Sequence, residues 1–260
     1  MCKPALIDAH IHLDLYEGYE RDKILQELEL YSVEALISVS FHLQSTRTNL
    51  DLSRRDARIK PAAGFHPEQE LPSKRDVEEL LAFIKLYQQE IVAIGEVGLP
   101  YYRMKEDPDV KVEPYIDLLE QFFIESKRVN KPIILHAVYE HAPIVCDLLE
   151  KHSIEKAHFH WFKGDEKTIE RMKKNGYSIS ITPDVLYEKE IQELVKKYPI
   201  EGLMVETDGP WRFEGIFQGR MTHPGIMHRS IEKIAEIKRI KEAEVYKQLF
   251  KNTTEFYGIS

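Results

Sequence analysis

Eight short apolar runs, each followed by an amphipathic stretch, constrain the fold of this 260-residue chain more than any other feature. The runs are residues 6–13, 34–40, 59–67, 91–99, 132–138, 156–162, 177–183 and 202–210. Between them apolar residues recur with helical spacing, as Ile116, Leu119 and Phe123 do within 113–129. This alternation predicts an α/β fold, a (β/α)8 TIM barrel that forms a single domain over residues 1–260. An open doubly wound sheet is the alternative, but no GxGxxG motif follows the first run to support dinucleotide binding.

Composition narrows the class of protein. The chain is 43% hydrophobic and 31% charged, which suits a globular protein with a sizeable core. Its net charge of −8 argues against a protein that coats nucleic acid electrostatically, although an enzyme could still reach a few phosphates through metal ions. Cys2 and Cys146 make neither a disulfide framework nor a thiolate zinc site. Without an apolar run of membrane-spanning length or a signal segment, we expect a cytoplasmic protein, with no membrane contact and no obligate protein partner.

Histidines and carboxylates gather near the ends of the runs. In LIDAHIHL, residues 6–13, His10 and His12 are two positions apart, so a strand would point both to one face. The other candidates also fall late in their runs: His66, Glu96, His136, His160 and Asp208. Because a barrel builds its active site at the C-terminal ends of its strands, all these side chains are expected at one mouth.

These residue types are typical ligands of divalent metal ions. Imidazoles and carboxylates bind zinc or another first-row ion, whereas manganese or magnesium would suit the carboxylates and a phosphate substrate. Four imidazoles and two carboxylates exceed the needs of one tetrahedral ion with an open position, so they predict two ions with Glu96 as the bridge. Two ions about 3.5–4 Å apart can activate a water and clamp the oxygens of a hydrolysed ester. Asp208 is expected to hold one ion and accept the proton of the water.

Each of these residues also has a structural interpretation when taken alone. His136 is compatible with a hydrogen-bonded core histidine, Glu96 with a buried ion pair and Asp208 with a turn cap. Their joint placement at strand ends favours the metal site, since core residues would be distributed along the whole length of the strands.

Further histidines and one carboxylate are assigned less specific roles. His158 shares a strand face with His160, and because it lies deeper we expect a core or supporting histidine. Glu206 likewise lies two positions before Asp208 on the same strand face. Two roles are possible for it, a buried hydrogen-bonded carboxylate or a residue of the site. Four histidines outside the runs are expected at the surface: His42, His141, His152 and His228.

Six fragments, in order along the chain, resemble the TatD family of metal-dependent hydrolases. IDAHIHL resembles its DxHxH segment, AAGFHPE its GxHP, IGEVGL its GExGLD, KPIILH its PxxxH, FHWFKG its HxFxG and VETDGPW its ETDxPx; the ending FKNTTEFYG resembles the family's last helix. The resemblance implies a (β/α)8 barrel with two divalent ions and phosphodiester hydrolysis, typically nuclease action on DNA ends. The first ion would be held by His10, His12, Glu96 and Asp208. The second would be held by Glu96, His136 and His160, and His66 would line the substrate side.

The sequence departs from the family pattern where substrate should lie. The aspartate after GExGL, the arginine two residues after the fifth-run histidine and the asparagine before the last loop's proline are replaced by Pro100, Val138 and His223. The loop that follows the eighth run, residues 209–225, offers substitutes. Trp211 could stack on a base, and Arg212 and Arg220 could pair with a phosphate.

Together these features predict a TatD-type metal-dependent hydrolase acting on ester bonds, a phosphodiesterase or deoxyribonuclease with Asp208 and Glu96 in catalytic roles. The expected substrate is a phosphodiester or another small hydrolysable molecule, DNA ends included. One alternative is a hydrolase of small-molecule esters or amides, which the acidic net charge and the missing arginine favour. Another is a metal-containing barrel that binds a ligand without turnover.

Overall fold

The computed structural model describes residues 4–259, and its eight parallel strands confirm the predicted (β/α)8 barrel. The strands pair with their neighbours in chain order, from β1 to β8. They are β1 (Leu6–Ile11), β2 (Val33–Ser38), β3 (Ile59–Ala63), β4 (Ala93–Gly98), β5 (Ile133–His136), β6 (Ala157–Phe159), β7 (Ser178–Ile181) and β8 (Leu203–Val205). Every apolar run coincides with a strand, although β2 begins one residue before its run, and each strand ends before its run does.

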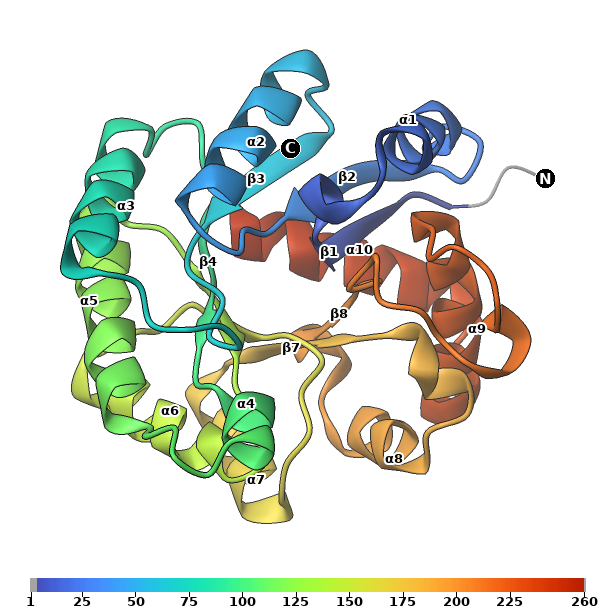
Figure 1. Ribbon diagram of the computed structural model, residues 1–260. Coiled ribbons are helices and arrows are strands. Elements are labelled where there is room, and N and C mark those ends of the chain that lie inside the picture. The colour runs from blue at the N-terminus through green and yellow to red at the C-terminus, as the bar shows by residue number, and fades with distance from the viewer. Residues whose placement is uncertain (1–3, 260) are drawn as a thin grey trace.

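Helices surround the strands, and Figure 1 shows most of them as a ring outside the barrel. They are α1 (Gly18–Glu27), α2 (Leu43–Arg55), α3 (Lys74–Leu86), α4 (Tyr101–Glu106), α5 (Glu113–Val129), α6 (His141–Lys151), α7 (Glu166–Asn175), α8 (Lys189–Lys197), α9 (Met227–Lys238) and α10 (Glu242–Tyr257). Local signals set their ends. Ser73 and Asp76 form a capping box at the start of α3, and Asn130 in a left-handed conformation ends α5. The described part of the chain contains no helix with the length and apolar character that crossing a bilayer requires.

The first and last strands meet at a polar seam. Beyond the end of β8, the backbone N–H of Asp208 donates to His10 O at 2.9 Å, and that of His12 donates to Gly209 O at 2.8 Å. The buried carboxyl of Asp8 accepts hydrogen bonds from the hydroxyl of Thr207 at 2.5 Å and from its backbone N–H at 3.0 Å. The two chain segments that carry candidate metal ligands are therefore held together by direct hydrogen bonds.

Apolar side chains form two clusters, one on each side of the strands. Ile133 and Leu135 belong to the larger cluster shared with the helices, whereas Ile134 between them belongs to a smaller one. The smaller cluster takes side chains from β1 to β5 and β8 and includes Tyr257 of α10. Figure 1 shows α10 behind the strands, so this helix closes one end of the barrel and leaves the opposite end open.

A chain of hydrogen bonds crosses the barrel interior from α10 to β8. Glu206 Oε2 can only accept, so the Ser180 hydroxyl donates to it at 2.5 Å. Ser180 then accepts from His158 Nε2 at 2.6 Å, and His158 Nδ1 accepts from the Tyr257 hydroxyl at 2.7 Å. Glu206 also accepts the backbone N–H of Trp161 at 2.7 Å. His158 is thus the supporting histidine that the sequence predicts, and Glu206 is a buried, hydrogen-bonded carboxylate.

Two of the histidines expected at the surface are buried, and that expectation is wrong for them. His141 and His228 are 4% and 0% exposed. His228 is in the first turn of α9, with Nδ1 2.5 Å from the hydroxyl of Tyr246 on α10 and Nε2 2.8 Å from Tyr31 O. A position outside the apolar runs does not reveal which face of a helix a residue occupies. Cys146 is buried and free, and Cys2 lies outside the described residues.

Removal of the Tyr257 hydroxyl tests the interior chain. The Tyr257→Phe substitution leaves the ring in place but takes the donor away from buried His158 Nδ1. We expect the free energy of unfolding to fall by about 1–3 kcal/mol, the cost of an unsatisfied buried polar group. Chemical denaturation measures the change, with Tyr19→Phe as the control because Tyr19 is 74% exposed. Equal stability of the two variants would contradict a structural role for the chain.

Candidate metal centre

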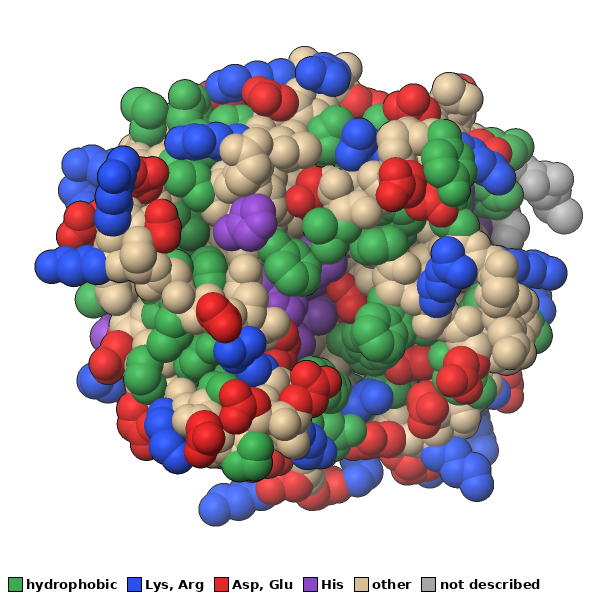
Figure 2. Space-filling view, in the orientation of Figure 1, with side chains coloured by type: hydrophobic (Ala, Val, Ile, Leu, Met, Phe, Trp, Pro, Cys, Tyr) green, Lys and Arg blue, Asp and Glu red, His purple; other side chains and the backbone are tan. Residues whose placement is uncertain are grey.

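The predicted metal ligands lie together at the open mouth of the barrel. His10, Glu96 and His136 are in the C-terminal parts of β1, β4 and β5, while the remaining three follow directly after β1, β6 and β8. These three are His12, His160 and Asp208. Figure 2 looks into this mouth and shows histidine side chains at the bottom of a hollow, with hydrophobic side chains around them. The barrel therefore gathers residues that are up to two hundred positions apart in the chain.

Four donor atoms form the first set, around Glu96 Oε2. The Nε2 atoms of His10 and His12 are 3.4 Å apart, and each is 3.2 Å from Glu96 Oε2. Asp208 Oδ1 lies 3.4 and 3.5 Å from the same two nitrogens. A tetrahedron whose corners are about 2.0–2.1 Å from its centre, as zinc ligands are, has edges of about 3.3–3.4 Å. The spacing of His10, His12 and Glu96 therefore fits three corners of a tetrahedral site, and Asp208 lies beside the two nitrogens as a further ligand atom.

The second donor set surrounds the other oxygen of the same carboxylate. Glu96 Oε1 is 2.7 Å from His160 Nε2 and 2.9 Å from His136 Nδ1, and these two nitrogens are 3.3 Å apart. His66 Nε2 lies 3.4 Å from Glu96 Oε1 on the same side. Each oxygen of Glu96 thus faces its own group of imidazoles, as a bridging ligand would.

Buried groups without partners support a cation at this centre. Among the described residues, Glu96 Oε2 is buried with no hydrogen bond. A buried carboxylate oxygen in that condition is costly unless a positive charge lies next to it. The Nδ1 atoms of His10, His12 and His160 are also without a hydrogen bond, but the donor sets contain the Nε2 atoms of these rings. The unpartnered Glu96 oxygen and the Nε2 atoms beside it therefore fit a divalent ion.

Burial and the neighbouring charges within the cluster shift the pKa values of its members. Burial by itself would lower the pKa of His12, but hydrogen bonds to Asp208 and Glu96 raise it to about 9. Burial by itself would raise the pKa of Glu96, but the surrounding histidines, His160 first, hold it well below its usual range. The pKa of Asp208 is lowered in the same way by His10 and His12. Because a metal requires unprotonated ligands, binding of an ion to this centre would release protons from its histidines.

His66 differs from the other histidines of the centre. Its Nδ1 accepts the backbone N–H of Glu68 at 3.2 Å, so the neutral ring carries its proton on Nε2. Burial lowers the pKa of His66 to about 3, which keeps the ring neutral. His66 therefore presents an N–H donor toward the centre, in keeping with its predicted place on the substrate side.

A cavity of about 760 Å³ opens onto the centre. His12, His66, His136, His160 and Asp208 form its floor. Its walls are mainly apolar and aromatic, with two cations and two further carboxylates: Leu15, Phe41, Tyr102, Val138, Trp161, Trp211, Lys163, Arg212, Glu68 and Glu106. Trp211 and Arg212 thus lie where the sequence predicts substrate contacts, whereas Arg220 is exposed and is not among the lining residues.

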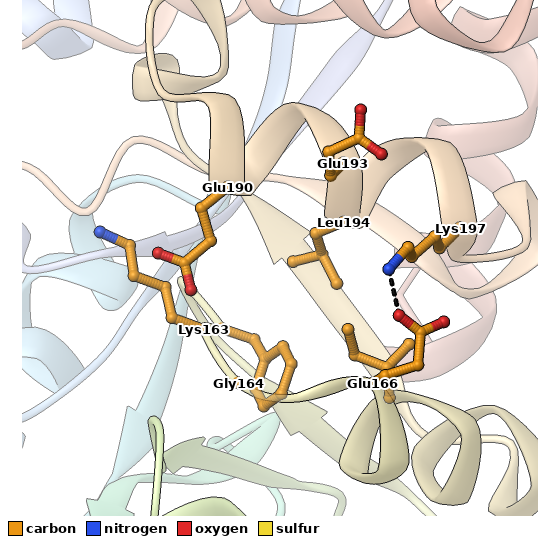
Figure 3. Close-up of a pocket in the computed structure, with 9 residues that line it drawn as sticks. Lys163, Gly164, Glu166, Glu190, Glu193, Leu194 and Lys197 are labelled. Atoms are coloured by element: carbon orange, nitrogen blue, oxygen red, sulfur yellow. Dashed lines mark hydrogen bonds and ion pairs between the residues drawn. The ribbon is translucent and has the colours of Figure 1, made fainter.

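A second hollow lies between α7 and α8 and holds about 130 Å³. Figure 3 shows Lys197 paired with Glu166 across it and Lys163 extending away from it, beside Glu190. The residues that line it contain no histidine or cysteine that could bind a metal. The cavity above the histidines is therefore the candidate active site.

Two residues that position this site were not identified in the sequence. Asp8 connects β1 to Thr207, directly before Asp208, and Glu68 lies 3.1 Å from His136 Nε2. Both carboxylates fall next to predicted ligands in the chain, in DAHIH and FHPE. That proximity was the available signal, but their partners are close only in the folded protein.

Comparisons with known proteins agree with this geometry. Residues 7–258 match the family model described as TatD related DNase. An uncharacterized metal-dependent hydrolase of Haemophilus influenzae is 38% identical over 98% of this chain and 100% of its own. The human deoxyribonuclease TATDN3 is 29% identical over 97% of this chain and 94% of its own. The crystal structure of YJJV, a TatD homolog from Escherichia coli, superposes with a TM-score of 0.87 at 24% identity, covering 98% of both chains.

Metal removal and addition test the centre. Adding zinc to chelator-treated protein, at a hundred times its dissociation constant, should stabilise the fold by about 2.7 kcal/mol and raise the melting temperature by about 5–10 °C. The Glu96→Gln variant should show a much smaller rise, because it lacks the charge that both donor sets share. Scanning fluorimetry measures both, with the exposed Glu78→Gln as a matched control. An unchanged rise in Glu96→Gln would place the ion elsewhere.

Proposed function

The chain belongs to the family of TatD-related DNases, and from that premise we propose that it is a phosphodiesterase that acts on DNA ends or small nucleotides with two divalent ions. Membership makes it a metal-dependent hydrolase; the phosphodiester substrate and the two ions are our proposal. The observation that carries it is the Glu96 carboxylate, which directs one oxygen to each of two donor sets at the floor of a large cavity.

The proposal assigns the ligands by their distances. His10, His12, Glu96 and Asp208 would hold one ion, and Glu96, His136 and His160 the other. Zinc fits this imidazole-rich set better than magnesium does, and manganese is an alternative. When bound, the two ions would supply Lewis acidity, which makes water a nucleophile near neutral pH and offsets charge on a phosphoryl group.

Residues of the chain would carry out the remaining steps. Asp208 directs Oδ1 to His10 and His12, which leaves Oδ2 free to accept the proton of the attacking water. His66 would donate its Nε2–H to a substrate oxygen, since its tautomer is fixed by the Glu68 backbone. Arg212 would pair with a phosphate and Trp211 would stack on a base at the cavity wall. Arg220 remains a further candidate for phosphate contact from the same loop.

A hydrolase of small-molecule esters or amides is the second candidate. Val138 lies in the cavity wall where the family carries an arginine, and the walls are mainly apolar. Such a surface favours an uncharged substrate over a phosphodiester. Activity with zinc or manganese restored, compared between a 3′-recessed oligonucleotide and panels of lactones and amides, separates the two functions. Absence of hydrolysis with all of these substrates would favour a metal-containing barrel that binds a ligand without turnover.

Loss of the proposed base gives the most direct test. The Asp208→Asn substitution preserves shape and one oxygen ligand but removes the proton acceptor, so kcat should fall by about 10²–10⁴-fold. The assay uses metal-loaded protein and a simple phosphodiester, with circular dichroism as a check on folding. The exposed loop variant Glu214→Gln serves as the control. Turnover at the wild-type rate in Asp208→Asn would refute the assignment.

Removal of the indole tests base recognition. Trp211 is 59% exposed at the cavity wall, so Trp211→Ala should raise KM for an oligonucleotide about 5- to 150-fold, the range for one base–aromatic stack. The same variant should leave KM unchanged for an oligonucleotide that ends in an abasic deoxyribose. An equal rise for both substrates would show that Trp211 shapes the cavity without recognising a base.

A further inference from the structure

Glu68 contacts the metal centre although it is not one of the proposed ligands. It follows His66 by two residues, after β3, and its side chain is 14% exposed at the edge of the cavity. Its Oε1 lies 3.1 Å from His136 Nε2. Glu68 therefore contacts Nε2 of His136, whose other ring nitrogen, Nδ1, faces Glu96.

The Glu68 carboxylate is itself held in place by α4. The backbone N–H of Tyr102 donates to Oε1 at 2.9 Å, and that of Arg103 donates to Oε2 at 2.7 Å. Both oxygens are thus fixed by the first turn of a helix that follows β4. A carboxylate fixed in this way cannot turn freely away from His136.

Both ring nitrogens of His136 face a carboxylate: Nε2 lies 3.1 Å from Glu68 Oε1, and Nδ1 lies 2.9 Å from Glu96 Oε1 and 3.3 Å from His160 Nε2. A ligating His136 would give the lone pair of Nδ1 to the ion, so the proton of the neutral ring would lie on Nε2. An ionised carboxylate only accepts hydrogen bonds, so Glu68 favours this tautomer by accepting from Nε2. His136 therefore directs a ligand atom into the second donor set.

The same residue has the opposite effect on His66. Its backbone N–H donates to His66 Nδ1 at 3.2 Å, which leaves the His66 proton on Nε2, facing the centre. Glu68 thus favours the tautomer in which His136 can bind an ion through Nδ1, and the tautomer in which His66 donates its Nε2–H. The two rings lie side by side, with centroids 5.0 Å apart.

We propose that Glu68 is a positioning residue that fixes the tautomer and ring orientation of His136 and so sets the affinity of the second donor set for its cation. The proposal rests on the proposed function, which places an ion there. Carboxylates that hold the outer nitrogen of a ligating histidine contribute about 10–100-fold to metal affinity. Glu68 would act through His136 without touching the reacting atoms.

Zinc binding provides the first readout. Competition with a chelator measures the affinity of each of two zinc ions for wild type, Glu68→Ala, Glu68→Gln and the control Glu70→Gln, whose side chain is 89% exposed. In Glu68→Ala the affinity for one ion should fall about 10–100-fold while the other keeps its wild-type value. Glu68→Gln should lose less, because its amide oxygen still accepts from Nε2. Two unchanged affinities in Glu68→Ala would overturn the proposal.

Nitrogen NMR of His136 in the zinc-free protein provides a readout independent of catalysis. The wild type and Glu70→Gln should show the proton on Nε2 in slow exchange with water. Both Glu68 variants should show faster exchange, and Glu68→Gln carries this test if Glu68→Ala does not fold. Identical His136 signals in all four proteins would overturn the positioning role. A wild type that binds one zinc ion would instead refute the two-ion proposal, and the NMR comparison would still decide the role of Glu68.

Discussion

One buried carboxylate, that of Glu96, determines how the mouth of this barrel is arranged. Its side chain is completely buried, and in the described part of the chain no lysine or arginine forms an ion pair with it. A charge in that position is costly unless opposite charge surrounds it. Five histidines surround the carboxylate, neutral His66 as an N–H donor, and each lies within 3.4 Å of one of its oxygens: His10, His12, His66, His136 and His160. They come from four different strands and the segments after them, so the shell exists only when the barrel is closed.

Closure of the barrel and assembly of the site are consequently the same event. The seam between β1 and β8 is formed by backbone hydrogen bonds of His10, His12 and Asp208, the residues that make the first donor set. Gly209 is required at this seam, because a Cβ on it would overlap the Tyr16 hydroxyl at 1.7 Å. Burial raises the pKa of Asp8 to about 8, although its hydrogen bonds from Thr207 act in the opposite direction.

The sequence alone predicted the barrel and the residues that gather at its mouth. Alternating apolar runs identify strands, and the rule that barrel sites form at strand ends converts a position in the chain into a position in space. It was less accurate about the ends themselves: His12, His66, His160 and Asp208 lie beyond their strands, because pairing stops where the mouth opens.

The supporting contacts could not be predicted from the sequence, because they join distant segments. Glu68 and His136 are 68 positions apart, and His158 and Tyr257 are 99 apart. The spacing of apolar residues along the chain does not predict such pairs. They form because loops and α10 pack against the barrel. The contacts of His66 and His136 with Glu68 have the same origin, since the backbone N–H of Glu68 donates to one ring and its carboxylate lies 3.1 Å from the other.

The residues that line the cavity wall come from a different part of the chain than the candidate ligands do. Glu96 and the histidines around it belong to strands or follow them directly, where backbone pairing fixes them. Trp211 and Arg212 belong to the long loop after β8, and Val138 follows β5. A change in these wall residues alters shape and charge above the centre without moving a ligand. The mainly apolar wall is therefore compatible with the two donor sets that the strand ends hold together below it.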